Sequence, residues 1–407
     1  MKASTGDPKY QGLSPNDLGF AYFDLSVQLS KDGYLYFSKL ETLKDLKFLF
    51  TLSEKLSEKL APDVTHICVL ASSGMALGVS IALVTRLPII FYKSAGWPMP
   101  ESHGLGPRFL PTVPLNAKVA LVDSHEHTRY TSALCYDELT RQGIQVVQSI
   151  TPISFDVTID STWNRNIDYS FLSSFSEMFD RIAQKHLAIA TPQDFLKYIM
   201  AADNRFWLAP PIPRQDAPYY EFDAPGMRAR PYWFIGRGHS PTFIETINSE
   251  FSSLLTRKID PSDQGRWNFF SDPRLVEDWA RTAGDVLKID EYDYLIGAGH
   301  LGTALALSLA YYNQDKFAGK ILFYLGRDGF LPQETTLRGK KILPIEMIIT
   351  TGVYAVDIYH RVLELGGRID KYVTVLRPIR TLNLLTQSRL TSISRLISHG
   401  IKFISFE

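Results

Sequence analysis

The chain has 407 residues, enough for two or three domains that each bury a sizeable core. Its 43 lysines and arginines equal its 43 aspartates and glutamates, so the net charge does not indicate nucleic acid or an anionic membrane as a partner. The two cysteines, Cys68 and Cys135, are too few for a disulfide framework or a cysteine-rich metal site, which suits a reducing cytoplasm.

Neither a signal peptide nor a membrane span is expected. Residues 1–19 are polar and lack an apolar core, which favours a cytoplasmic protein. Residues 67–85 form an uncharged stretch of nearly the length that crosses a bilayer, but Ser72, Ser73 and Gly74 interrupt it. We therefore predict a strand, a turn and a buried helix there.

One order of elements occurs twice along the chain. An amphipathic helix leads into an apolar strand, a glycine-containing turn, a helix of small residues and a second strand. Next come a strand that ends in an acid, a hydroxyl-rich loop, a helix ending at glycine and a closing strand. The segments are 36–60, 66–74, 75–85, 89–93, 119–131 and 146–153 in the first copy, and 269–288, 293–299, 300–310, 321–328, 342–354 and 372–378 in the second. This alternation predicts an α/β fold with a mostly parallel sheet, flanked by helices, in each half.

The segment between the copies predicts the domain organisation. Residues 170–205 have a helical pattern, and several prolines between Pro210 and Pro218 indicate a hinge. We therefore predict a first domain over 1–160, a helical connector with a Pro-rich hinge over 161–215, and a second domain over 216–407.

The strand, acid and Thr-Thr-Gly loop of residues 342–354 resemble the signature of the type I phosphoribosyltransferase family, and residues 119–131 resemble it in part. In that family the loop holds the 5′-phosphate of phosphoribosyl pyrophosphate (PRPP), the acids hold the ribose hydroxyls, and an earlier glycine-containing turn approaches the pyrophosphate. The resemblance covers roughly 36–155 and 265–380, so it implies two tandem phosphoribosyltransferase-like units.

In the first copy the resemblance is incomplete. Asp123 takes the first acidic position, and Ser124 replaces the second acid. Thr128 and Thr131 match the phosphate-binding hydroxyl positions. Arg129 stands where the family has a small glycine, so its side chain should crowd the backbone unless the arginine itself binds the phosphate.

In the second copy the phosphate loop is better preserved. Glu346 takes the first acidic position and Met347 replaces the second, while Thr350, Thr351 and Gly352 match the phosphate-binding loop. An acid near the ribose can stabilise the positive charge of an oxocarbenium-like transition state, so Asp123 and Glu346 are the catalytic candidates.

The resemblance also implies residues near the pyrophosphate. They are Ser73, Gly74 and Lys93 in the first copy and Gly297, Gly299 and Arg327 in the second. The departing pyrophosphate usually carries Mg²⁺, so we expect Mg²⁺ to arrive with the ligand and predict no metal site made by the protein itself. The implied function is binding of a PRPP- or nucleotide-like ligand, and making or breaking an N-glycosidic bond at ribose C1.

Several alternatives stay open. Each copy lacks one acid, which favours a protein that kept the fold and lost the reaction, acting as a nucleotide-binding effector through a protein partner or a homo-oligomer, for example in bacterial defence. The sequence GAGHLG, residues 297–302, also fits a dinucleotide-binding fingerprint with Asp328 as the ribose acid, which predicts an oxidoreductase. His125 and His127 could bind a metal together with Asp123.

Overall fold

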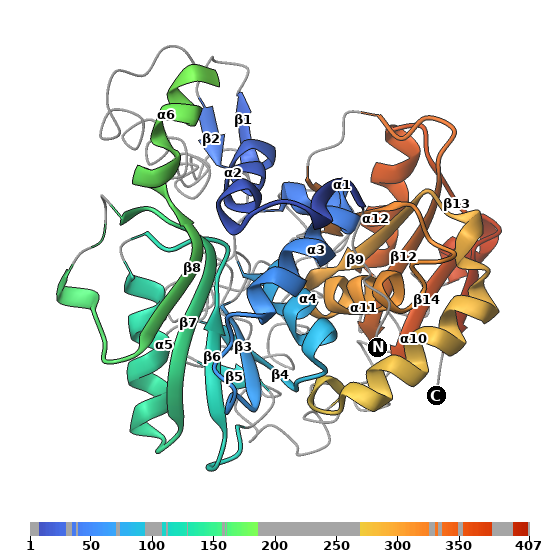
Figure 1. Cartoon of the computed structure of the whole chain (residues 1–407). Coiled ribbons are helices and arrows are strands. Elements are labelled where there is room, and N and C mark those ends of the chain that lie inside the picture. Colours follow the sequence, from blue (N-terminus) through green and yellow to red (C-terminus); the bar gives the residue numbers. More distant parts are fainter. Residues whose placement is uncertain are drawn as a thin grey trace, which may run out of the picture. The chain divides into compact units, whose positions relative to one another are not determined.

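The computed structural model describes residues 8–29, 35–37, 40–70, 74–93, 108–110, 113–127, 129–156, 159, 161–185, 269–324, 330–332, 336–348, 353–376 and 394–405. Within this part the chain divides into two compact units. The first includes 8–93 and 109–185 and is coloured blue to green in Figure 1; the second includes 269–405 and is coloured yellow to red.

The first unit is built on a six-stranded sheet in the order β5-β4-β3-β6-β7-β8, and the strands from β4 to β8 pair in parallel. The strands are β3 (His66–Leu70), β4 (Ile89–Lys93), β5 (Arg108–Leu110), β6 (Lys118–Val122), β7 (Gln145–Ser154) and β8 (Asp168–Ser174). The helices are α1 (Pro8–Gln11), α2 (Pro15–Ser26), α3 (Leu46–Ser57), α4 (Met75–Thr85), α5 (Tyr130–Arg141) and α6 (Phe175–Lys185), with 3-10 turns η1 (Glu41–Lys44) and η3 (Ser161–Trp163). A separate antiparallel ladder joins β1 (Val27–Leu29) to β2 (Leu35–Phe37).

The second unit is built on a sheet in the order β11-β10-β9-β12-β14-β15, with β13 beside β12. All of its pairs are parallel except β10 with β11. The strands are β9 (Tyr294–Ala298), β10 (Lys320–Tyr324), β11 (Phe330–Leu331), β12 (Lys341–Ile348), β13 (Arg368–Ile369), β14 (Lys371–Leu376) and β15 (Lys402–Ser405). The helices are α10 (Pro273–Leu287), α11 (Gly299–Tyr312) and α12 (Val353–Glu364), with 3-10 turns η6 (Phe269–Ser271) and η7 (Ile289–Glu291).

The two sheets have the same strand order, and this confirms the predicted α/β class with mostly parallel sheets. β3 corresponds to β9, β4 to β10, β6 to β12 and β7 to β14. In the first sheet β3 connects through α4 to β4 on one side, and the chain then returns to place β6 on the other side of β3. In the second sheet β9, α11, β10 and β12 follow the same order. The order therefore reverses between β3 and β6, and again between β9 and β12. In open α/β sheets, ligands bind outside the carboxyl ends of the strands at such a reversal.

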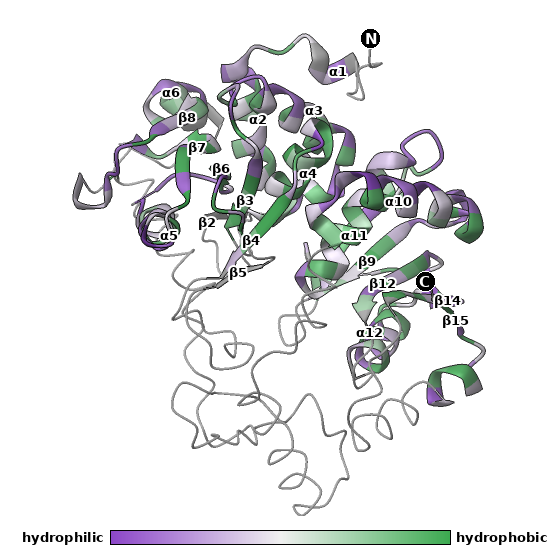
Figure 2. Cartoon of the chain, turned by 90° about the horizontal axis from the view of Figure 1, so that it is seen from below, coloured by the Kyte–Doolittle hydropathy of each residue, from purple (hydrophilic) through white to green (hydrophobic). Residues whose placement is uncertain are grey.

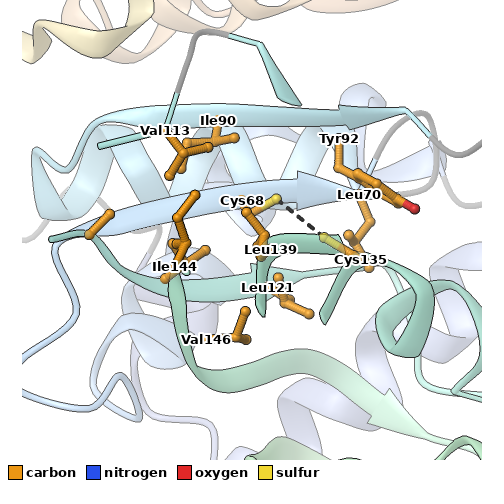
Figure 3. Close-up of a cluster of buried hydrophobic side chains, with 12 residues drawn as sticks. Cys68, Leu70, Ile90, Tyr92, Val113, Leu121, Cys135, Leu139, Ile144 and Val146 are labelled. Carbon is orange, nitrogen blue, oxygen red and sulfur yellow. Dashed lines mark hydrogen bonds between the residues drawn. The ribbon is translucent and has the colours of Figure 1, made fainter. Parts of the chain in front are cut away.

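Apolar strands with helices on both faces explain how the sheets form. In Figure 2 the strands β3, β4 and β9 have the colour of hydrophobic residues. This is expected for strands that are covered by helices on both faces of the sheet. The core between the first sheet and α5 is shown in Figure 3, where Cys68 and Cys135 are buried free thiols with their Sγ atoms 3.7 Å apart. The predicted glycine ends of α5 and α12 are confirmed, because Gly143 (φ 78°) and Gly366 (φ 80°) take the left-handed conformation.

The apolar stretch 67–85 forms a strand and a buried helix, as predicted. It contains most of β3 and all of α4, whose residues Met75 to Leu83 are buried. Gly78 lies against Val69 of β3, where a Cβ atom would come within 2.6 Å of the valine side chain. Among the described residues, no helix has both the length and the apolar character needed to cross a membrane.

Two predicted helix boundaries are wrong. The helix predicted from residue 36 begins at Leu46, where the Asp45 side chain accepts a hydrogen bond from Phe48 N and caps it. The helical pattern predicted from residue 170 begins at Phe175, because β8 takes the residues before it into the first sheet. Residues 186–205 and the Pro-rich hinge lie outside the described part, so the predicted domain boundaries remain predictions.

Candidate ligand site at the strand ends

In both units an acid and a glycine-containing turn meet where the strand order reverses. In the second unit the turn at Gly299 follows β9, and Glu346 lies near the end of β12. In the first unit Gly74 follows β3 and Asp123 follows β6. The fold therefore brings together the predicted acid and the predicted turn of each copy.

A surface hollow of about 420 Å³ lies elsewhere, at the ends of α10 and α11, and is lined by Gly284, Asp285, Lys288, Asp290, Asp315 and Lys316.

Glycines allow the first turn of α11 to lie directly on the strands of the second unit. A Cβ atom on Gly302 would come within 2.5 Å of the Ile345 carbonyl oxygen in β12. One on Gly297 would come within 2.3 Å of the Thr303 Cα atom. The Thr303 hydroxyl donates to the carbonyl of Gly299 at 2.9 Å, and Gly299 has a φ of 66° that favours glycine. The N-terminus of α11 therefore sits against β12 immediately before Glu346.

Glu346 is a partly buried acid with a single hydrogen-bond partner among the described residues. The Tyr372 hydroxyl of β14 donates to Glu346 Oε2 at 2.9 Å. Tyr372 is itself buried and packs against Ala355 and Tyr359 of α12, so Glu346 and α12 share one face of the sheet. Removal from water raises the pKa of Glu346 to about 8, although the tyrosine hydrogen bond opposes this shift.

Two further tyrosines lie beside this acid. Tyr354, in the first turn of α12, is 36% exposed, and burial and the Glu346 carboxylate raise its pKa. Its ring contacts the ring of Tyr324, the last residue of β10, with centroids 5.6 Å apart. The Tyr324 side chain is fully buried, and its hydroxyl finds no hydrogen-bond partner among the described residues. A buried hydroxyl without a partner costs on the order of 1–3 kcal/mol, so this end of β10 is suited to a polar group from a ligand.

The sequence alone did not identify Tyr372 and Tyr324 as site residues. Tyr372 reaches Glu346 only because β14 pairs in parallel with β12 in the register that places Thr374 beside Glu346. The alternation of side chains then puts Tyr372 on the face of the acid. The sequence shows only a tyrosine within an apolar strand. It does not show how β14 is aligned with β12.

The predicted phosphate loop of the second unit stays a prediction. Thr350, Thr351, Gly352 and Arg327 lie outside the described residues. The helix α12 begins at Val353, directly after the Thr-Thr-Gly sequence. Because the first N–H groups of a helix lack partners within it, the predicted loop leads into a helix end that attracts anions.

In the first unit, Asp123 lies partly buried between the end of β6 and the start of α4. A Cβ atom on Gly74 would come within 2.3 Å of the Val122 carbonyl oxygen, so α4 begins directly against the end of β6. The Asp123 carboxylate accepts a hydrogen bond from Ser124 N at 2.7 Å. Tyr22 of α2 is fully buried, and burial together with the nearby Asp123 carboxylate raises its pKa. The acid of the first copy is therefore close enough to this tyrosine to influence its pKa.

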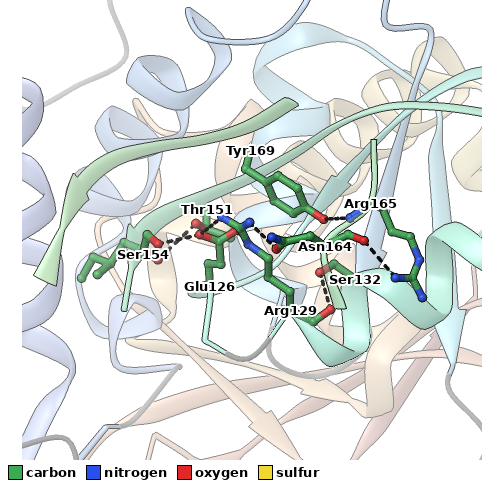
Figure 4. Close-up of polar contacts among 9 residues, drawn as sticks. Glu126, Arg129, Ser132, Thr151, Ser154, Asn164, Arg165 and Tyr169 are labelled. Carbon is green, nitrogen blue, oxygen red and sulfur yellow. Dashed lines mark hydrogen bonds and ion pairs between the residues drawn. The ribbon is translucent and has the colours of Figure 1, made fainter. Parts of the chain in front are cut away.

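The loop after β6 is held by an internal ion pair. Arg129 Nε lies 2.8 Å from Glu126 Oε1, and Arg129 Nη2 lies 3.2 Å from Oε2 (Figure 4). Ser154 donates to Glu126 Oε2 at 2.5 Å, Asn164 accepts from Arg129 Nη1, and the guanidinium lies 3.7 Å from the ring centroid of Tyr169. We call these five residues the Glu126–Arg129 cluster.

The backbone of this loop is also engaged. Glu126 N donates to the Ile153 carbonyl, and the Glu126 carbonyl accepts from Phe155 N, both at 2.8 Å. Arg129 takes the left-handed conformation, with a φ of 65°, in place of the family's glycine. Its guanidinium pairs with Glu126. The described part of this loop is thus joined to the end of β7 through the backbone of Glu126.

The remaining predicted residues of the first unit are placed as follows. Thr131 lies partly buried in the first turn of α5. Lys93 is the last residue of β4, and its side chain lies outside the described part, as do Ser73 and Thr128. The roles implied for these residues remain predictions.

The histidines of the loop pack against an aromatic ring. The ring centroids of His125 and Phe155 are 5.4 Å apart, and those of His127 and Phe155 are 6.5 Å apart. His125 Nδ1 lies 2.9 Å from the Ser124 hydroxyl. Within the described part of the chain, no three or more His, Cys, Asp or Glu side chains converge to hold a metal ion.

The order and direction of the strands argue against the hypothesis that GAGHLG binds a dinucleotide. Gly297 lies inside β9, and α11 starts at Gly299, so strand, turn and helix follow in the required order. However, β11 runs antiparallel to β10. Each half of a dinucleotide-binding fold is a βαβαβ unit whose strands are all parallel. Asp328, the acid that this reading needs, lies outside the described residues.

Comparison with known proteins finds structural likeness alone. No family model matches the chain, and no curated protein matches it. UMP synthase of Leishmania donovani is 14% identical with a TM-score of 0.35, over 47% of this chain and 43% of that one. Orotate phosphoribosyltransferase of Aeropyrum pernix is 14% identical with a TM-score of 0.35, over 41% of this chain and 98% of that one.

A third similar structure is adenine phosphoribosyltransferase of Thermoanaerobacter pseudethanolicus. It is 17% identical with a TM-score of 0.32, over 38% of this chain and 99% of that one. The chain spans less than half of the UMP synthase and nearly the whole of the two single enzymes. Because these scores are below 0.5, the likeness does not decide what this chain binds or does, and the geometry of the strand ends has to support any proposal.

Proposed function

We propose that the second unit binds a phosphorylated ribose, as found in PRPP or a nucleotide, at the carboxyl ends of β9 and β12. The observation that supports this most is the position of Glu346. It lies where the strand order reverses, and both α11 and α12 begin at this edge of the sheet. The positive ends of two helices suit a phosphate, and an acid between them suits sugar hydroxyls.

The described side chains around Glu346 support a ligand rich in hydroxyls. Tyr354 is partly exposed at the start of α12, and Tyr324 has a buried hydroxyl without a partner among the described residues. The predicted loop of Thr350, Thr351 and Gly352 would hold the 5′-phosphate. The ribose would then lie between that loop and Glu346. This arrangement is suited to an N-glycosidic bond being made or broken at C1, with Mg²⁺ arriving on the pyrophosphate.

A second candidate is a nucleotide-binding protein without turnover that acts through a protein partner or a homo-oligomer. It is favoured by what occupies the second acidic position in each copy. Met347 is buried, and Ser124 is fully buried in the loop after β6. Neither residue offers a second carboxylate to the ribose. Turnover with PRPP and Mg²⁺ would distinguish the enzyme from this binder.

A thermal-shift titration tests the proposal. The ligands are PRPP with Mg²⁺, ribose 5-phosphate, AMP and NAD, and the proteins are wild type, Thr351→Ala and Thr131→Ala. Binding at 100 times the Kd should stabilise the fold by about 2.7 kcal/mol. We expect phosphoribosyl ligands to stabilise wild type and Thr131→Ala, and not Thr351→Ala. A shift with NAD alone would support the dinucleotide reading instead, and no shift with any ligand would refute the proposal.

A further inference from the structure

Two free cysteines face each other in the core of the first unit. Cys68 is the third residue of β3, Cys135 lies in α5, and their Sγ atoms are 3.7 Å apart (Figure 3). Both side chains are fully buried. A disulfide holds its sulfur atoms about 2 Å apart, so the two sulfur atoms together have to move by about 1.7 Å to form one. Modest rotations of the two side chains about their Cα–Cβ bonds cover such a distance.

The second unit shows what the fold itself needs at these two places. The third residue of β9 is Ile296. In α12, Ile358 stands as far along the chain from Glu346 as Cys135 stands from Asp123. Both isoleucines are fully buried in the corresponding core. Apolar side chains therefore fill these positions in the other copy, and the packing of the fold does not require a pair of thiols.

The two cysteines belong to elements on either side of the loop after β6. The strand β3 pairs with β6, and α5 begins at Tyr130, directly after Arg129. Cys135 lies in the second turn of this helix. A bond between Cys68 and Cys135 therefore connects the first half of α5 to the centre of the sheet. It also restrains the end of the loop that contains the Glu126–Arg129 cluster.

We propose that Cys68 and Cys135 are a redox-sensitive pair, which hydrogen peroxide converts into a disulfide that fixes α5 to β3. The pair is independent of the proposed ligand site, because both cysteines lie in the first unit. Hydrogen peroxide suits a buried pair, because the molecule is little larger than water and needs only a small opening of the core. Under reducing conditions the two thiols stay free.

The reaction has two steps. One thiolate attacks a peroxide oxygen and the O–O bond breaks, so the cysteine becomes a sulfenic acid, while the hydroxide that leaves takes up the thiol proton and forms water. The second thiolate then attacks this sulfur, the S–S bond forms, the S–O bond breaks and a second water leaves. Two thiols and one peroxide thus give one disulfide and two waters. Burial and the neighbouring Cys68 raise the pKa of the Cys135 thiol, so the reaction should be slower than that of an exposed thiol.

Peroxide treatment of the folded, full-length protein tests the proposal. The chain has two cysteines, so a thiol count in denaturant should fall from two to none, and dithiothreitol should restore both. A digest without reductant should contain one crosslinked pair of peptides, with Cys68 in one and Cys135 in the other. Thiols that stay free, a covalent dimer of two chains, or a sulfinic acid as the main product would overturn the proposal.

A second measurement tests whether the bond fixes α5. A disulfide removes open conformations from the unfolded chain, so peroxide should raise the denaturant midpoint of wild type, and reductant should reverse this. Cys135→Ala is the matched control, because it has the same seven methionines for peroxide to oxidise and cannot form the bond. An equal response of both proteins would mean that the bond fixes nothing. If Cys135→Ala does not fold, the thiol count and the digest of wild type decide the outcome.

Discussion

Gly302 determines how closely α11 approaches β12, and so where the helix end lies relative to Glu346. The nearest atom to a Cβ at this position is a backbone carbonyl oxygen, which cannot rotate away as a side chain can. Gly302→Ala should therefore lower the free energy of unfolding by about 1–3 kcal/mol. Denaturant unfolding measures this.

Gly12 provides the matched control. A Cβ atom at Gly12 would meet nothing within 4 Å, so Gly12→Ala should leave the free energy of unfolding nearly unchanged. Equal stability of the Gly302→Ala and Gly12→Ala proteins would mean that α11 can move away from β12 at little cost. The position proposed for the ligand would then lose its structural basis.

At the residue scale the sequence could predict Glu346 and the glycine turn, because both belong to a contiguous pattern. It could not predict the partners that decide their chemistry. Tyr372 is 26 residues from Glu346 and reaches it through strand register. Arg129 stands at the position of the family's glycine, yet its guanidinium binds Glu126, a pairing that the sequence alone did not predict.

At the element scale, α10 and α11 are joined by a buried amide. Asn313, just after α11, donates through Nδ2 to the carbonyls of Ala280 at 2.8 Å and Leu309 at 2.9 Å. A Cβ atom on Gly284 of α10 would come within 2.1 Å of Asn313 Oδ1. The helix pair therefore depends on a glycine that faces an asparagine.

A double-substitution cycle tests this contact. Gly284→Ala should destabilise the protein by about 1–3 kcal/mol through crowding. Asn313→Ala should also destabilise it, because two carbonyls lose a donor. In the double variant the added methyl group gains space, so its loss of stability should be smaller than the sum of the two. Strict additivity would contradict the predicted crowding.

The loop after β6 should be stabilised by its ion pair. The side chains of Arg129 and Glu126 are 13% and 6% exposed, so Arg129→Met leaves a buried carboxylate without its cation. We expect a loss of about 3–5 kcal/mol in the free energy of unfolding. Adding Glu126→Gln should recover part of this loss, because the uncompensated charge is removed.

A surface pair at the start of β6, the strand that leads into this loop, is the control. Lys118 and Asp63 lie 2.7 Å apart, with side chains 40% and 49% exposed. Lys118→Met should cost about 0–1 kcal/mol. If Arg129→Met cost no more than Lys118→Met, the Glu126–Arg129 cluster would not hold the loop, and the first unit could still open to a ligand.

The elements were predicted well where a strand, turn and helix followed one another, as in β3 with α4 and β9 with α11. The prediction was wrong at β8, because its pairing with β7 depends on distant residues. The buried side chain of Gln148 donates to Asp168 and Ser170 of β8 and to the Lys59 carbonyl. A local helical pattern around residue 170 cannot compete with these contacts.

At the scale of the whole molecule, two sheets of the same order differ at their strand ends. In the second unit the acid accepts a hydrogen bond from the Tyr372 hydroxyl, and two helices start at the same edge of the sheet. In the first unit the acid lies near Tyr22 of α2, and the Glu126–Arg129 cluster holds the loop that follows it. We therefore expect one ligand for each chain, bound by the second unit.

The most direct test of this account is the stoichiometry of PRPP binding, measured by calorimetry in the presence of Mg²⁺. We predict one molecule bound for each chain of wild type and of Thr131→Ala, and none for Thr351→Ala. Two molecules bound for each chain, or one that remains in Thr351→Ala, would contradict the proposal that the second unit holds the ligand.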